Sequence, residues 1–347
     1  MTVIARFHLF VRRSDTNIIA LENRCDIKLS TSTVLPIMSG ISSSNRKRTI
    51  RIRVRGNRVA ALVGVYGLFG AGWLPAQLDY SSRIEQWRAR HEAALKAQDG
   101  WLAVAGLFWL KDGANLAGSG PSNAIKLPRG SVRAGVFEFH AGATTFRAAA
   151  GVTAFLNGKV ARSAVQLKSD ADGSADRLQI AGMSISVIQR ANRYGIRLWD
   201  PASAARQHFN GLHWFPVNEK YRVTARFVAY EKPKMIPITN VLGDTEPEAS
   251  PGYVEFILDG QRLRLEPVTE DQQLFFIFRD LTAGRETYPA GRFLYASAPK
   301  NGEVELDFNK AENPPCAFTP YATCPLPPKQ NHLAVRIAAG ELNYGEH

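Results

Sequence analysis

The chain has 347 residues, of which 45% are hydrophobic and 21% charged, a composition that is typical of globular proteins and excludes disorder throughout. Its net charge of +12 suggests a nucleic-acid partner, but residues 1–58 hold 12 Lys/Arg and 3 Asp/Glu, whereas the remaining residues hold 31 and 28. The part that folds therefore lacks the basic excess that nucleic-acid binding requires, and we expect no nucleic-acid partner.

The first 78 residues predict a targeting segment. Residues 1–58 are a basic leader, which we interpret as disordered or as the result of a mis-assigned translation start. Residues 59–78, VAALVGVYGLFGAGWLPAQL, carry no charge and follow a run of arginines, which is the order of a signal peptide. An uncleaved anchor is the alternative, because about 20 apolar residues can cross a bilayer. We expect an exported protein, periplasmic or secreted, that contacts a membrane only through residues 59–78 if they are not cleaved.

Residues 79–100 predict a short amphipathic helix that Asp99 and Gly100 terminate. Ile84, Trp87, His91 and Leu95 share one stripe at helical spacing. No second residue of a ligand type stands at a suitable spacing from His91, so we interpret it as a packed residue at the edge of the core and not as a metal ligand.

Residues 101–200 change to a period of two, as in the alternation of Phe137 and Phe139 with polar residues. Asn157-Gly158 is the favoured dipeptide of a two-residue hairpin. These signals predict an antiparallel β-sandwich of seven to ten strands. The strings GANLAGSGPSNAIKLP and LQIAGMSISVI resemble the strand order of forkhead-associated sandwiches. The residues that read phosphothreonine in that family are not in place, so the resemblance concerns shape alone.

Residues 201–347 predict a second β-rich domain, a sandwich or partial barrel, so the fold class is mainly β with one short N-terminal helix. The expected strands lie in YRVTARFVAY, GYVEFILDGQRLRLEP, QLFFIFRD, EVELDFN and NHLAVRIAAGE. Asp259-Gly260 predicts a hairpin. The segment LFFIFRD is apolar on both faces and should be a central strand that is covered on both sides.

The strings LFFIFRDLTAGRETYPAGRFLYA and VELDFNKAENPPCAFTPYATCPLPPKQN closely resemble a bacterial family of unknown function, number 1684. The resemblance covers roughly residues 83–344 and implies an exported protein to which no activity is assigned. Glu312 departs from the family's pattern, which has an aromatic residue in AYNPPC. If that ring packs on the loop, the change bears on the local order of this chain.

The usual enzyme motifs, HExxH, GxSxG and a Walker loop, are absent from the sequence, and we expect no cofactor and no bound metal. The candidate ligand-binding residues lie on strand ends and loops near the C-terminus: Arg285, Tyr288, Arg292, Asp307, Asn309 and Asn313. One interpretation is a hairpin connection whose arginines pair with neighbouring acids. The other is a pocket in which the two arginines bind an anionic group and Asp307 is a weak candidate for a general base.

Residues 313–328, NPPCAFTPYATCPLPP, place Cys316 and Cys324 in a proline-rich loop. An exported protein with two cysteines in one loop favours a disulfide; reduced structural thiols, a nucleophile and a metal site are the alternatives. The aromatic stretch FNGLHWFPVNEKYRV, which includes Trp214, lines a sugar site or, as we prefer, fills the junction between strand layers.

Three functions remain open. The first is a non-catalytic envelope module that binds a small anionic or glycan-like ligand, or a partner protein, near Arg285, Tyr288 and Arg292. The second is an envelope hydrolase with Asp307 as base and Arg285 and Arg292 steadying negative charge. The third is a purely structural envelope protein.

Overall fold

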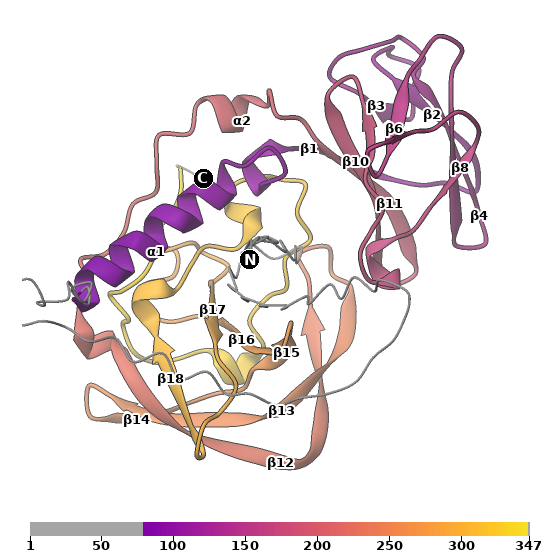
Figure 1. Cartoon of the computed structure of the whole chain (residues 1–347). Helices are drawn as coiled ribbons and strands as arrows, with labels where there is room; N and C mark the ends of the chain where they lie inside the picture. Colours follow the sequence, from indigo (N-terminus) through magenta and orange to yellow (C-terminus); the bar gives the residue numbers. More distant parts are fainter. Residues whose placement is uncertain (1–78, 346–347) are drawn as a thin grey trace, which may run out of the picture. The chain divides into compact units, whose positions relative to one another are not determined.

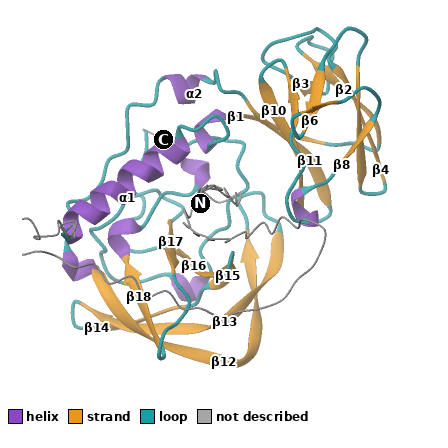
Figure 2. Cartoon of the chain, in the orientation of Figure 1, coloured by secondary structure: helices purple, strands orange, loops and turns teal. Residues whose placement is uncertain are grey.

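The computed structural model describes residues 79–345, which form a mainly β fold (Figures 1 and 2). The basic leader and the signal or anchor segment that the sequence predicts lie outside these residues. Within the described part, the helices are too short or too polar to cross a membrane.

The predicted helix is α1, Tyr80–Leu95. The side chain of Asp79 caps its first turn by accepting a hydrogen bond from the amide of Ser82 at 2.9 Å. Gly100 follows at a position where a Cβ atom would lie 2.3 Å from the carbonyl oxygen of Ala94, so this close approach requires glycine. The buried stripe of α1 includes Tyr80, Arg88 and His91, and is therefore more polar than the apolar stripe that the sequence suggests.

The first sandwich has eleven strands, one more than the upper limit of the prediction. One sheet has the order β1-β11-β10-β9-β6-β7 and the other β3-β2-β4-β5-β8. The strands are β1 Val104–Trp109, β2 Gly113–Gly118, β3 Ile125–Lys126, β4 Gly135–His140, β5 Ala143–Ala148, β6 Ala154–Leu156, β7 Lys159–Val160, β8 Val165–Leu167, β9 Leu178–Ile180, β10 Met183–Arg190 and β11 Arg193–Trp199. All pairs are antiparallel except β2 with β3. The likeness to forkhead-associated sandwiches stays a prediction.

Both sheets contribute to one core, which contains Phe137 and Phe146 from the five-stranded sheet and Ile185 and Ile196 from the six-stranded sheet. The hairpin predicted at Asn157-Gly158 is confirmed: it joins β6 to β7, and both residues have positive φ, 49° and 81°. Such φ values match the right-handed twist of the paired strands, and Asn and Gly tolerate them best.

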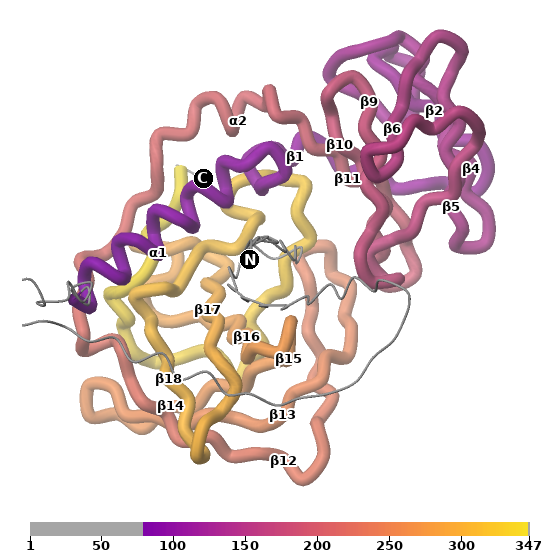
Figure 3. The backbone as a smooth tube through the Cα atoms, viewed as in Figure 1, coloured from indigo at the N-terminus to yellow at the C-terminus, as the bar shows by residue number. Residues whose placement is uncertain are grey.

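The second sandwich follows a short helix, α2 Ala204–Gln207, and pairs a four-stranded sheet, β14-β13-β12-β18, with a three-stranded sheet, β15-β16-β17. Its strands are β12 Arg222–Thr239, β13 Thr245–Leu258, β14 Gln261–Leu265, β15 Val268–Glu270, β16 Gln273–Phe278, β17 Arg292–Ala296 and β18 Glu303–Asp307. The hairpin at Asp259-Gly260 is confirmed between β13 and β14. The path of the chain through both sheets can be followed in Figure 3.

The prediction of a central strand with two covered faces is confirmed for β16. Phe276 and Phe278 enter the core between the two sheets, whereas Phe275 and Ile277 enter a second cluster on the opposite face. That second cluster also contains Cys324, so the proline-rich loop covers the outer face of the three-stranded sheet.

The strand predicted in NHLAVRIAAGE is wrong. Residues 333–340 form no strand, although Leu333, Val335, Ile337 and Ala339 alternate into the core as the period predicts. The backbone partners of this C-terminal coil are single contacts instead of a ladder. Leu281 donates to the carbonyl of Val335 at 2.9 Å, and the amide of Ile337 donates to the carboxylate of Asp280 at 2.7 Å. A period of two in the sequence indicates which side chains are buried. A segment is a strand only if its backbone also forms a ladder of hydrogen bonds with an adjacent strand.

Candidate functional site

A band of buried polar side chains joins α1 to the C-terminal segments that lie beside it in Figure 1. We call this band the α1 seam and define it by Tyr80, Arg88 and His91 of α1 together with Asp307, Asn309, Glu312, Asn313 and Glu341. Three of the predicted ligand-binding residues, Asp307, Asn309 and Asn313, belong to it.

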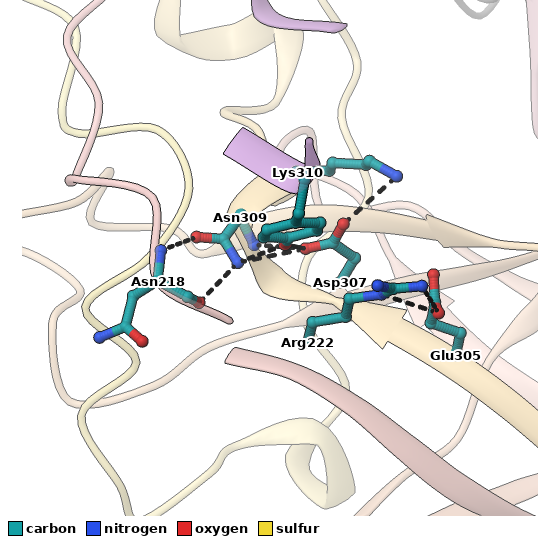
Figure 4. A network of polar contacts seen from close by, with 7 residues as sticks. Asn218, Arg222, Glu305, Asp307, Asn309 and Lys310 are labelled. Atoms are coloured by element: carbon teal, nitrogen blue, oxygen red, sulfur yellow. Dashed lines mark hydrogen bonds and ion pairs between the residues drawn. The ribbon is translucent and has the colours of Figure 1, made fainter. Parts of the chain in front are cut away.

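At one end of the α1 seam, Asp307 ends β18 and meets Tyr80. The Tyr80 hydroxyl donates to Asp307 Oδ1 at 2.7 Å and accepts from Asn309 Nδ2 at 2.8 Å. Asn309 also binds both backbone groups of Asn218, at 2.9 Å each (Figure 4). Burial and the neighbouring Asp307 carboxylate raise the pKa of the Tyr80 phenol well above its usual range.

Asp307 is only 5% exposed, and its second oxygen lies 3.3 Å from the ammonium of Lys310 (Figure 4). Its carboxylate contacts Tyr80, Asn309 and Lys310. A general base must reach the proton that it removes, and this carboxylate is instead occupied in attaching α1 to the second sandwich.

At the other end of the α1 seam, His91 stands between two carboxylates. Its Nδ1 lies 3.2 Å from Glu312 Oε2, and its Nε2 lies 3.6 Å from Glu341 Oε2. Trp87 stacks on the imidazole with ring centroids 5.3 Å apart, and Trp214 meets it edge-on at 5.9 Å. The imidazole is thus enclosed by two rings and two acids.

The two acids and the histidine shift each other's protonation. Burial lowers the pKa of His91, but the charges of Glu312, Glu341 and Glu92 outweigh it and raise this pKa from 6.5 to about 9. Burial raises the pKa of Glu312 from 4.5 to about 7; His91 opposes this rise, and Glu341 and Glu270 add to it. Because Glu312 titrates near neutral pH, this end of the seam can hold or release a proton under physiological conditions.

The remaining partners fix the backbone around this cluster. Asn313 binds Glu341 twice, through its amide N–H at 2.9 Å and through Nδ2 at 2.7 Å. Glu312 exchanges two backbone hydrogen bonds with Phe293 of β17, each 2.9 Å long. These backbone hydrogen bonds hold residue 312 in place, and they do not require the aromatic side chain that the family pattern has at this position.

Arg292 lies at the start of β17 and is 1% exposed. Its guanidinium donates to Asp280 Oδ1 at 3.2 Å, to the carbonyl of Ile337 at 3.1 Å and to the carbonyl of Ala339. These partners come from the loop after β16 and from the C-terminal coil. Arg292 therefore joins interior segments and does not present its fork to an external anion.

Arg285 and Tyr288 lie on the loop between β16 and β17, Arg285 exposed and Tyr288 partly exposed. Tyr288 packs against a buried cluster that contains Leu95 and Phe318, and the partly exposed rings of Trp101, Trp214 and Tyr344 pack against the same cluster. We call these four rings, Trp101, Trp214, Tyr288 and Tyr344, the aromatic surface. Trp214 comes from the aromatic stretch that the sequence analysis singled out, whereas Phe209 and Phe215 of that stretch are buried.

Cys316 and Cys324 are both free thiols in the structure. The amide N–H of Cys316 donates to Cys324 Sγ at 3.1 Å, so the two residues lie in contact as the sequence analysis expected, and the disulfide between them stays a prediction. Among residues 79–345, no group of three or more His, Cys, Asp or Glu side chains is arranged to hold a metal ion.

Sequence reasoning brought together Asp307 and Asn309 but missed the acids that surround His91. The position of His91 on the buried stripe was visible, and a histidine on an apolar stripe already indicates a buried partner. The identity of that partner was not visible, because Glu312 and Glu341 come from segments more than 200 positions away.

These features define a mainly β protein of two sandwiches, in which a buried polar seam attaches an N-terminal helix to the C-terminal segments. Residues 207–342 match the model of the family described as "Protein of unknown function (DUF1684)", and this part of the chain belongs to that family. The solution NMR structure of an uncharacterized protein of Haloarcula marismortui is 34% identical to the chain, with a TM-score of 0.35; the match covers 41% of this chain and 81% of the other. No curated protein matches the chain.

Proposed function

We propose that the protein is a non-catalytic envelope module that binds a small glycan-like ligand through the aromatic surface, with Arg285 available to a negatively charged substituent. The observation that carries this proposal is the gathering of four partly exposed rings around one buried cluster. Flat aromatic rings pack well on the apolar faces of sugars, and a ring that is already packed on its inner side loses little conformational entropy on binding.

The hydrolase alternative receives less support from the geometry. It requires Asp307 and Arg292 to meet a substrate, and both side chains are buried and bonded to interior groups. The purely structural alternative predicts that no small ligand binds, so the binding experiment separates it from our proposal.

The binding proposal is tested with the purified protein on an array of neutral and acidic oligosaccharides, followed by calorimetric titration of any sugar that binds. We expect Tyr288→Ala to weaken binding about tenfold, which corresponds to about 1.4 kcal/mol. Arg285→Ala should weaken only the acidic sugars. Tyr253→Ala serves as the matched control, since Tyr253 is a partly exposed tyrosine on β13, outside the aromatic surface.

Two results contradict the proposal. If the unaltered protein binds no oligosaccharide, the glycan reading is rejected in favour of a structural role. If Tyr253→Ala weakens binding as much as Tyr288→Ala, the contact does not depend on the aromatic surface.

Export is a separate part of the proposal, supported by the order of charged and apolar residues in residues 46–78. The N-terminal residue of protein recovered from the periplasm or the medium measures it: cleavage near Pro75 to Gln77 is the expected result. A chain that retains residues 59–78 in the membrane fraction supports the anchor instead. In an oxidising compartment we expect Cys316 and Cys324 to join as a disulfide, and the intact mass before and after reduction reports this.

A further inference from the structure

The backbone around Cys316 and Cys324 is fixed by contacts on both sides of the pair. After Cys324, the chain runs beside the end of β12: the amide of Val241 donates to the carbonyl of Cys324 at 2.9 Å, and the amide of Leu326 donates to the carbonyl of Thr239 at 2.7 Å. Cys316 lies in a single turn of 3-10 helix, Pro315–Ala317. Proline residues in the loop restrict the backbone further.

Between the two cysteines, the loop is attached to the first sandwich. The Thr319 hydroxyl donates to the carbonyl of Val104 at 3.2 Å, and the Thr323 hydroxyl accepts from Arg190 Nε at 2.9 Å. The segment that separates the cysteines is thus held at Thr319 and at Thr323. These contacts hold the two cysteines near each other whether or not a covalent bond joins them, because the fold itself supplies the closure that a disulfide would provide.

The two thiols have different environments. Cys316 is partly exposed, whereas Cys324 is buried and packs in the cluster on the outer face of the three-stranded sheet. The hydrogen bond with the Cys324 thiol lowers the pKa of Cys316, and the positive charge of Arg197 adds to this effect. Burial raises the pKa of Cys324, and its interaction with Cys316 raises it further.

We propose that Cys316 and Cys324 form a reactive dithiol that exchanges with low-molecular-weight disulfides, with Cys316 as the attacking thiol and Cys324 as the resolving thiol. Cys316, the partly exposed residue, meets the incoming disulfide, and Cys324, the buried residue beside it, then attacks Cys316. Such a division of roles requires two adjacent thiols of unequal exposure, which is the arrangement that the loop creates. This inference does not depend on the proposed sugar binding.

The exchange proceeds in two balanced steps. In the first, the Cys316 thiolate forms a bond to one sulfur of the external disulfide, the old sulfur–sulfur bond breaks, and one thiolate leaves and takes up a proton. In the second, the Cys324 thiol gives up its proton and attacks the Cys316 sulfur, and the second external thiolate leaves. The external disulfide is thereby reduced to two thiols, and the two cysteines are oxidised to one internal disulfide.

The test uses the reduced full chain, incubated with glutathione disulfide, quenched with acid and alkylated at successive times. Trypsin releases both cysteines in one peptide, residues 311–329, whereas Cys25 falls in residues 25–28. Further cleavage after Phe318 or Tyr321 separates the two cysteines. Mass spectrometry therefore shows which sulfur carries the first glutathione adduct and when the internal disulfide replaces it.

We expect the first adduct on Cys316, followed by loss of glutathione and formation of the internal disulfide. Cys324→Ser should accumulate the adduct on Cys316, and Cys316→Ser should react at least about tenfold more slowly than Cys324→Ser. Circular dichroism of each variant verifies folding, and the order of events in the unaltered chain tests the proposal without any substitution.

Three results overturn the inference. One is a first adduct on Cys324. Another is equal reaction rates of the two single variants. The third is an adduct on Cys316 that persists without forming the internal disulfide.

Discussion

Replacing Glu312 by glutamine should remove a pH dependence of folding that the α1 seam builds in. Glutamine keeps the shape of the side chain but does not titrate. The Glu312 side chain is 16% exposed, so solvent screens its interactions little. The charged groups around it are His91, which lowers its pKa, and Glu341 and Glu270, which raise it.

The magnitude follows from the shift of the Glu312 pKa from 4.5 to about 7. Between these two values the folded chain keeps the proton on Glu312 while the unfolded chain releases it. Because the folded state then binds more protons, the free energy of unfolding falls as pH rises. Two and a half pKa units correspond to about 3 kcal/mol over the interval. The unaltered protein should therefore lose about 3 kcal/mol relative to Glu312→Gln between pH 4.5 and 7.

The assay is urea unfolding of both proteins at constant ionic strength over this range. The quantity plotted against pH is the free energy of unfolding of the unaltered protein minus that of the variant, and we expect it to fall. Glu303→Gln is the matched control, since Glu303 is an exposed glutamate on β18 and its difference plot should stay flat within about 0.5 kcal/mol. A flat or rising difference for Glu312→Gln refutes the reasoning, because it means that the folded chain does not hold the extra proton.

His91 supplies a second readout of the same substitution. Its pKa of about 9 depends first on the charge of Glu312 among the groups that raise it, so in Glu312→Gln this pKa should fall by about one unit or more, and NMR titration measures it. In the unaltered protein His91 adds stability that is complete below pH 6.5 and is lost as pH rises toward 9.

Two further substitutions test the other buried contacts. Tyr80→Phe removes the hydroxyl between Asp307 and Asn309 and should lower the free energy of unfolding in urea by about 1–3 kcal/mol. The control Tyr253→Phe changes a partly exposed ring and should lower it little. Equal losses for the two variants would contradict the assigned role of the Tyr80 hydroxyl. Asp280→Asn leaves the Arg292 charge buried without its carboxylate partner and should lower the free energy of unfolding by about 3–5 kcal/mol in the same assay. The control Arg336→Ala breaks an exposed ion pair and should lower it by about 0–1 kcal/mol. A loss below about 1 kcal/mol for Asp280→Asn would show that the buried Arg292 charge is stabilised without the Asp280 carboxylate.

Local signals predicted the strands and turns well where neighbours in the chain are also neighbours in space. The hairpins at Asn157-Gly158 and Asp259-Gly260 depend on φ values that these residues adopt by themselves. The double-sided burial of β16 follows from its continuous apolar run. The same reasoning wrongly predicted a strand at residues 333–340, because the alternate burial of these residues arises from packing on the core and not from a strand ladder.

The candidate site was less predictable. The six predicted ligand-binding residues lie close together in the sequence, which favoured the prediction of one pocket. In the structure their side chains contact different partners. Arg292 binds Asp280, Asp307 binds Tyr80, and Asn313 binds Glu341. Charge and polarity predict that a buried group has a partner, but they do not say which one.

The sequence by itself determined the mainly β class, the presence of one amphipathic helix before the strands, the position of the turns and the family that residues 207–342 match. These properties depend on backbone preferences and on the period of apolar residues, which act over a few positions. Only the tertiary structure decided that Tyr80 meets Asp307, 227 positions away, and that His91 lies between two acids. Such contacts arise when packing brings distant segments together, and burial then gives ordinary side chains the altered proton affinities on which the predictions rest.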